Sequence, residues 1–161
     1  MALDLIAELE AVVDAFEREG LAYAICGGLA LALHGHPRAT MDIDLLVPPE
    51  QLVAASRVAR TLGFNVPARK MTFGLRNGAP REVQRISKLD PETNDLLSLD
   101  LLIVGPSLEQ VWADRTIMVV GERKMALVSR AGLATMKRLA GRPQDLADLA
   151  ALEGTGDDEQ D

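Results

Sequence analysis

The stretch over residues 24–47, AICGGLALALHGHPRATMDIDLLV, constrains the fold of this chain more than any other. It predicts a strand that ends at Cys26, a tight turn at Gly27-Gly28, a short helix over 29–34, a loop, and a second strand over 41–47. Glycine suits the turn because it has no Cβ to restrict the backbone. A strand–helix–strand unit of this kind predicts a sheet covered by helices.

Two carboxylates lie on the second predicted strand. Asp42 and Asp44 are two residues apart, so their side chains share one face, roughly 6.6 Å apart along the backbone. Two unpaired acids side by side repel each other and are costly to bury. Mg²⁺ resolves this conflict because it takes oxygen ligands and leaves positions open for substrate phosphates. The glycine turn opens a helix, where backbone N–H groups favour an anion, so we expect phosphates beside the metal.

A third acid, Asp100, interrupts the apolar run LLSLDLLIV over residues 96–104. A lone charge in such a strand is expensive unless it is paired or binds a metal. If this strand lies beside residues 41–47, three carboxylates surround two metal ions, as in-line nucleotidyl transfer requires. Asp100 could also accept the proton of the acceptor hydroxyl. The alternatives are an edge-strand acid that faces water or a member of an ion pair. Crowding of the three acids predicts that Asp100→Asn leaves the metal-free fold at least as stable.

The motif around these residues resembles that of the nucleotidyltransferase superfamily related to DNA polymerase beta. The resemblance is closest to the small bacterial nucleotidyltransferases that include abortive-infection and toxin–antitoxin members. It is strong over residues 20–50 and weaker over 95–104 and 130–152. The residues that carry it are Gly27-Gly28, His34-Gly35, Arg38, Thr40 and Asp42-Ile43-Asp44.

The resemblance implies an α/β (α+β) fold: a mixed central sheet with packed helices and a small C-terminal helical part. It also implies two Mg²⁺ ions, with Mn²⁺ as a substitute, and an NTP as co-substrate. The residues expected to be catalytic and to bind the metal are Asp42, Asp44 and Asp100. The residues expected at the nucleotide are Gly27, Gly28, Arg38, Thr40 and Lys137, of which Arg38 and Thr40 could instead fix the loop. His34 is expected to be a cap or packing residue.

The C-terminal segment MKRLAGRPQDLADL resembles the closing motif of the same family. Lys137 matches the family's basic position, which reaches phosphate, and Arg142-Pro143 and Asp145 match the positions that follow. Gln144 departs from the lysine that is usual there. Asp145 and Asp148 share one helix face by their spacing of three, and their roles stay open between function and capping or surface acids.

The remaining hydrophobic patterns and turn signals predict the other elements. The expected helices cover residues 2–19, 50–62, 107–113, 130–140 and 144–152. The other expected strands cover 21–26, 71–76, 82–89, 96–104, 116–120 and 124–128, with turns at Asn77-Gly78 and Asp90–Asp95.

Composition limits the class of protein. The length of 161 residues suits one domain over 1–153, followed by an acidic tail over 154–161 that we expect to be disordered. With 3% aromatic residues and a net charge of −7, the chain is neither a base-stacking RNA module nor a basic nucleic-acid binder. No apolar run reaches the roughly 18 residues of a membrane span. The single Cys26 suits a reducing compartment, so we expect a cytoplasmic protein.

These observations predict a nucleotidyltransferase with a two-metal-ion mechanism. It would move NMP from an NTP to an acceptor hydroxyl and release pyrophosphate. The sequence leaves open which NTP is used, the oligomeric state, and whether the acceptor is tRNA, a protein or a small molecule such as an antibiotic. The alternative is a catalytically silent interaction module with the same fold, such as a toxin–antitoxin component with a cognate protein partner.

Overall fold

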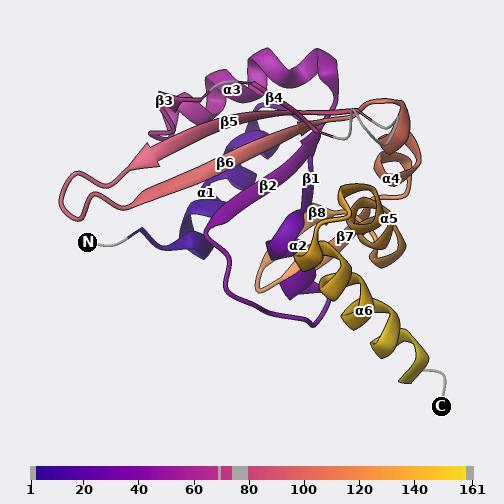
Figure 1. Cartoon of the computed structure of the whole chain (residues 1–161). Helices are drawn as coiled ribbons and strands as arrows, with labels where there is room; N and C mark the ends of the chain where they lie inside the picture. The colour runs from indigo at the N-terminus through magenta and orange to yellow at the C-terminus, as the bar shows by residue number, and fades with distance from the viewer. Residues whose placement is uncertain (1–2, 69, 74–79, 159–161) are drawn as a thin grey trace.

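A computed structural model describes residues 3–68, 70–73 and 80–158 of the chain, and its centre is one mixed β-sheet (Figure 1). The predicted α/β class is therefore confirmed. The strands are β1 (Ala24–Cys26), β2 (Asp42–Val47), β3 (Val66–Pro67), β4 (Met71–Phe73), β5 (Arg81–Leu89), β6 (Leu96–Ile103), β7 (Thr116–Val120) and β8 (Arg123–Leu127).

The order of the strands places the two predicted acidic strands side by side. The sheet runs β3-β5-β6-β2-β1-β8-β7, and β4 pairs with β5. The β2–β6 and β1–β8 pairs are parallel, and the other pairs are antiparallel. Strands β5 and β6 form a long hairpin that projects from the body of the molecule (Figure 1). The middle of the sheet is thus built from β6, β2 and β1.

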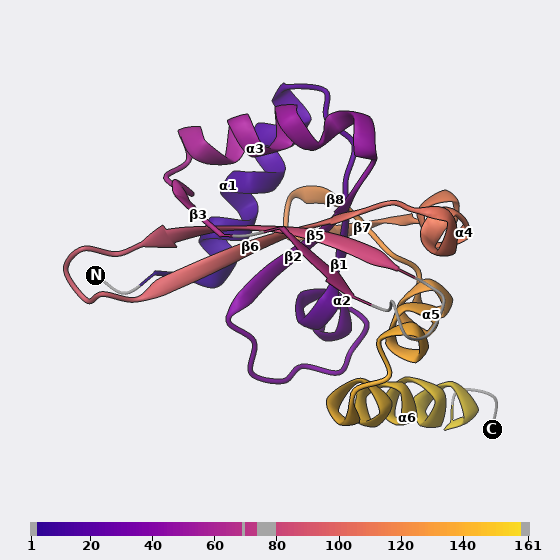
Figure 2. The same cartoon turned by 45° about the horizontal axis from the view of Figure 1, so that its top comes forward.

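Helices cover both faces of the sheet. Figure 2 shows α1 and α3 on one face, with α2, α5 and α6 on the other. The helices are α1 (Leu5–Arg18), α2 (Gly27–Leu33), α3 (Leu52–Thr61), α4 (Glu109–Ala113), α5 (Arg130–Ala140) and α6 (Pro143–Asp158), with 3₁₀ turns η1 (Pro49–Gln51) and η2 (Pro106–Leu108). Within the described part of the chain, no helix combines the length and apolar character needed to cross a membrane.

The core is built mainly from aliphatic side chains on the central strands. Ile25 of β1, Ile43 and Leu45 of β2, and Leu99 and Leu101 of β6 are fully buried. A strand that is covered on both faces is apolar on both faces, which explains the nearly continuous hydrophobic runs of β2 and β6. Because both strands are buried, the acids that lie between these apolar residues are held in fixed positions.

Two predicted elements differ clearly from the structure at one end. The last helix, α6, continues to Asp158, so the acidic tail predicted from residue 154 begins inside a helix. Gly154 costs such a helix only about 1 kcal/mol, which does not end it. The first strand starts at Ala24 rather than at residue 21, because the Ala22 N–H bonds the Gln51 side chain instead.

Strand β3 is absent from the predicted elements, because a two-residue strand that contains Pro67 carries no periodic signal. The predicted strand over 71–76 is described only at β4, and the turn predicted at Asn77-Gly78 lies outside the described residues.

Candidate active site

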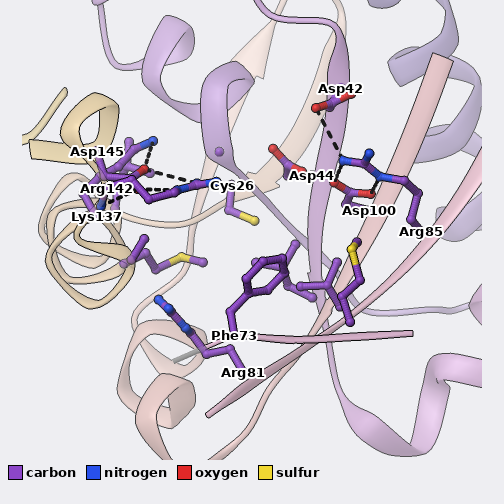
Figure 3. Close-up of a pocket in the computed structure, with 17 residues that line it drawn as sticks. Cys26, Asp42, Asp44, Phe73, Arg81, Arg85, Asp100, Lys137, Arg142 and Asp145 are labelled. Carbon is purple, nitrogen blue, oxygen red and sulfur yellow. Dashed lines mark hydrogen bonds and ion pairs between the residues drawn. The ribbon is translucent and has the colours of Figure 1, made fainter. Parts of the chain in front are cut away.

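The parallel pairing of β2 and β6 brings the three predicted acids together. Asp44 lies directly opposite Asp100, and Asp42 is two residues before Asp44 on the same strand. All three side chains line one cavity of about 380 Å³ between the sheet and the α5–α6 region (Figure 3). The cavity therefore has an acidic wall formed by two adjacent strands.

Asp44 has the most perturbed carboxyl group of the three. Burial is the largest cause that raises its pKa, to about 7, followed by the negative charges of Asp100 and Asp42 and a hydrogen bond with Asp100. Burial and the charge of Asp100 also raise the pKa of Asp42, and Arg85 partly offsets both. At Asp44, the positive charge of Lys137 offsets these effects only in part.

Arg85 of β5 is a member of this site that the sequence analysis missed. Its Nε and Nη2 donate to the two oxygens of Asp100 at 2.8 and 2.9 Å, and Nη2 lies 3.8 Å from Asp42 Oδ2. Asp100 is therefore an ion-pair member, one of the alternatives left open. The repulsion behind the Asp100→Asn prediction is present at Asp44. Removal of the Asp100 charge would also leave Arg85 without its bidentate partner, so Asp100→Asn is now expected to cost stability.

A signal for Arg85 was present in the predicted hairpin. Arg85 precedes the first residue of the Asp90–Asp95 turn by five positions, and Asp100 follows its last residue by five. Residues equidistant from a turn face each other in an antiparallel hairpin, as Arg85 and Asp100 do.

The glycine pair begins helix α2 itself rather than forming a turn before it. Gly27 is the first helical residue and has a φ of +65°. A Cβ on Gly27 would lie 2.0 Å from Asp44 Oδ2, and a Cβ on Gly28 would lie 2.8 Å from Thr40 Oγ1. The first glycine therefore makes room for the Asp44 carboxylate, and the second makes room for the loop before β2.

Gly27→Ala is expected to lower the free energy of unfolding by roughly 2–4 kcal/mol, because it combines a left-handed backbone with a clash at Asp44. Gly20→Ala is a matched control, since Gly20 has a φ of +68° and no atom within 4 Å of its Cβ position. Backbone strain alone should cost Gly20→Ala about 1–2 kcal/mol. Urea unfolding of both variants measures the difference, and equal losses would contradict the close approach of Gly27 to Asp44.

A second cluster of charges lies across the cavity, on α5 and α6. Lys137 is buried, and its Nζ lies 2.9 Å from Asp148 Oδ2 and 3.5 Å from Asp145 Oδ1. Arg142 Nε donates to Asp145 Oδ2 at 2.7 Å. Burial alone would raise the pKa of Asp148, but hydrogen bonds from Lys137, Gln144 and Arg38 hold it below the usual value. Asp145 and Asp148 are thus buried partners of cations rather than surface acids.

The residues predicted at the nucleotide fall into two groups. Gly27 and Lys137 line the cavity, whereas Gly28, Arg38 and Thr40 are not among its lining residues. Arg38 donates from Nε and Nη2 to the two Asp148 oxygens, both at 3.1 Å, and so ties the loop before β2 to α6. These contacts favour the loop-fixing interpretation of Arg38. His34 packs as expected, with Nε2 2.9 Å from the Val128 carbonyl oxygen.

The remaining lining residues come from parts of the sequence that carry no motif. Arg81, Met71, Phe73, Val83 and Leu102 belong to β4, β5 and β6 and form the wall between the two charged clusters. Their alternation along a strand predicts which face they share but not which element faces them, so the sequence gives no signal for this wall.

Among the residues with a described structure, no three His, Cys, Asp or Glu side chains converge closely enough to hold a metal ion. The chemistry of the three aspartates still fits one, because carboxylate oxygens are the ligands that Mg²⁺ prefers. The raised pKa of Asp44, whose charged form a cation would stabilise, supports the same fit. With a metal ion at the aspartates, Arg85 would still balance the charge of Asp100, with which it forms an ion pair.

Comparisons with known proteins give the fold. No protein-family model and no curated protein sequence matches the chain. Three solved structures resemble it over nearly their whole length. TM1012 of Thermotoga maritima, described as a candidate nucleotidyltransferase, has a TM-score of 0.62 and 13% identity, covering 93% of this chain and 92% of that one.

The other two structures are antibiotic-modifying proteins or their complexes. ANT(2'')-Ia in complex with adenylyl-2''-tobramycin has a TM-score of 0.64 and 16% identity, covering 94% of this chain and 88% of that one. The lincosamide antibiotic adenylyltransferase LnuA, with lincomycin bound, has a TM-score of 0.57 and 14% identity, covering 91% and 95%. The chain therefore has the fold that these nucleotidyltransferase structures share.

Proposed function

We propose that this chain is a nucleotidyltransferase that moves NMP from an NTP to an acceptor hydroxyl and releases pyrophosphate. The observation that carries the proposal is the convergence of Asp42, Asp44 and Asp100 on one cavity, on adjacent parallel strands of this fold. Three carboxylates on one wall of a cavity are costly unless they serve cations. The likeness to adenylyl-transferring structures supports the same chemistry.

Asp42, Asp44 and Asp100 would hold divalent metal, Mg²⁺ or Mn²⁺. When bound, the metal would neutralise phosphate charge and lower the pKa of the acceptor hydroxyl. Asp44 would take part in its ionised form, which a cation stabilises against the burial that raises its pKa. In the present arrangement both oxygens of Asp100 accept hydrogen bonds from Arg85.

The surroundings of the acids support a small acceptor. The cavity of about 380 Å³ lies in the range of small-molecule sites, and Met71, Phe73, Val83 and Leu102 give it an apolar wall. A tRNA acceptor would require a basic surface, and the chain has a net charge of −7. The two structural neighbours that carry antibiotics also favour a small molecule as the acceptor.

The silent interaction module remains the second candidate, and one observation favours it. Arg85 holds both oxygens of Asp100, as a permanent counter-ion would in a site that binds no metal. Arg85 is 37% exposed, so it has room to leave. Metal binding and turnover separate the two candidates.

The test is an incubation of the protein with α-labelled NTPs, Mg²⁺ and a panel of acceptors that includes an aminoglycoside, a lincosamide and total tRNA. We expect label on a small-molecule acceptor and an equal amount of pyrophosphate. Asp42→Asn should abolish both without loss of the fold, since the Asp42 side chain is 42% exposed. An unmodified panel together with no binding of any NTP would reject the enzyme and favour the silent module.

A further inference from the structure

The side of the cavity opposite the three aspartates carries an excess of positive charge. Asp145 is shared by Arg142 and Lys137, at 2.7 and 3.5 Å, and Asp148 is shared by Lys137 and Arg38, at 2.9 and 3.1 Å. Arg81 lies near this cluster, so four cationic side chains share two carboxylates. The cations predicted to contact phosphate, Lys137 and Arg38, are thus already neutralised by α6.

Arg81 is the cation of this cluster for which the described residues supply no ion-pair partner. It is the first residue of β5, lines the cavity, and extends toward the side where Lys137 and Arg142 lie, away from the aspartates (Figure 3). Its Nε atom is buried and has no hydrogen-bond partner among the described residues. Burial, and then the like charge of Arg142, lower its pKa, and Asp145 only partly offsets them. An unpartnered guanidinium beside a second arginine is a site for an anion.

We propose that Arg81 binds the polyphosphate of the nucleotide and, together with Arg142, forms the anion subsite of the cavity. The inference rests on the proposed function and names a residue for it that the motifs do not. A guanidinium presents a planar fork of donors that matches two phosphate oxygens. A polyphosphate with bound metal suits both ends of the cavity, because its metal faces the aspartates and its free oxygens face the arginines.

The experiment compares Arg81→Gln with the wild type in calorimetric titrations of ATP, pyrophosphate and AMP, each with Mg²⁺. Loss of a charge-assisted contact should weaken ATP and pyrophosphate by about 10- to 100-fold and AMP by about 3-fold or less. Arg81→Lys should recover part of the ATP affinity, because it keeps the charge but not the fork. Arg60→Gln is the matched control, an exposed arginine on α3 at the opposite face of the sheet, and it should change nothing.

The outcomes separate this inference from the proposed function. If ATP binds the wild type and Arg81→Gln equally well, Arg81 does not contact the polyphosphate, and the proposed function still stands. An equal loss for AMP and ATP would also overturn the inference, because it would place Arg81 at the nucleoside or the α-phosphate. If the wild type binds none of the three, the proposed function itself fails. A thermal melt of Arg81→Gln checks folding, and Arg81→Lys provides the test if that variant does not fold.

Discussion

Asp44→Asn is expected to remove Mn²⁺ binding and to lower nucleotidyl transfer by roughly 10³-fold, while the metal-free protein becomes more stable at neutral pH. The opposite effects have one cause. In the proposed site an ionised Asp44 would be a metal ligand, and its charge is unfavourable without metal because burial and the charges of Asp100 and Asp42 raise its pKa to about 7. The neutral amide keeps the shape of the side chain and removes both the ligand and the repulsion.

The dependence of stability on pH has a definite sign. The pKa of Asp44 is about 7 in the folded protein, whereas an unperturbed aspartate, as in the unfolded chain, has a pKa of 3.8. Between these two pH values the folded state therefore holds a proton that the unfolded chain has released. Stability of the wild type without metal therefore falls as pH rises from about 4 to about 7. The loss from this group is on the order of 3 kcal/mol, and Asp44→Asn should flatten the profile in that window.

Urea unfolding at a series of pH values, with a chelator present, measures this profile, and calorimetry measures Mn²⁺ binding. Asp95→Asn is the matched control, because Asp95 is an exposed aspartate in the β5–β6 turn. A profile of Asp44→Asn that is as steep as that of the wild type would show that another group causes the dependence. Equal Mn²⁺ affinity in the wild type and Asp44→Asn would exclude Asp44 as a ligand.

Lys137→Met is expected to destabilise the protein by about 3–5 kcal/mol, the usual result of breaking a buried ion pair from one side. Lys137 is 6% exposed, and its removal would leave the buried Asp145 and Asp148 without the cation that they share. The sequence predicted a phosphate ligand at this position, for which removal would weaken nucleotide binding and leave the fold intact. The buried ion pairs of Lys137 predict instead that its removal lowers the stability of the fold more than it weakens nucleotide binding.

A double-variant cycle tests this expectation. Lys137→Met combined with Asp148→Asn should recover part of the loss, because the second change removes a charge that the first left unpaired. Lys124→Met is the control at an exposed lysine on β8 and should change stability by about 0.5 kcal/mol or less. A stable Lys137→Met variant that has lost ATP affinity would restore the phosphate-ligand role and reject the structural one.

The sequence alone predicted the elements around the acids because their signals are local. Strand periodicity, the glycine pair and the turn residues placed β2, β6, β7 and α5 within a few residues of their observed bounds. Asp42 and Asp44 share a face by spacing alone, and Asp100 was identified by its isolation in an apolar run. Each of these inferences depends on neighbours along the chain, which a sequence displays directly.

Only the tertiary structure decided which charges compensate one another. The pairing of β2 with β6 brings Asp44 opposite Asp100, and the β5–β6 hairpin adds Arg85 to the same site. Arg38 and Asp148 are 110 residues apart in the chain and form a bidentate contact. A charge in a sequence has no partner until strands and helices pack, so the motif at Lys137 could not show that Asp145 and Asp148 already neutralise it. For the same reason Arg81, which belongs to no motif, became a candidate only once the described part of the fold had left its buried Nε without a hydrogen-bond partner.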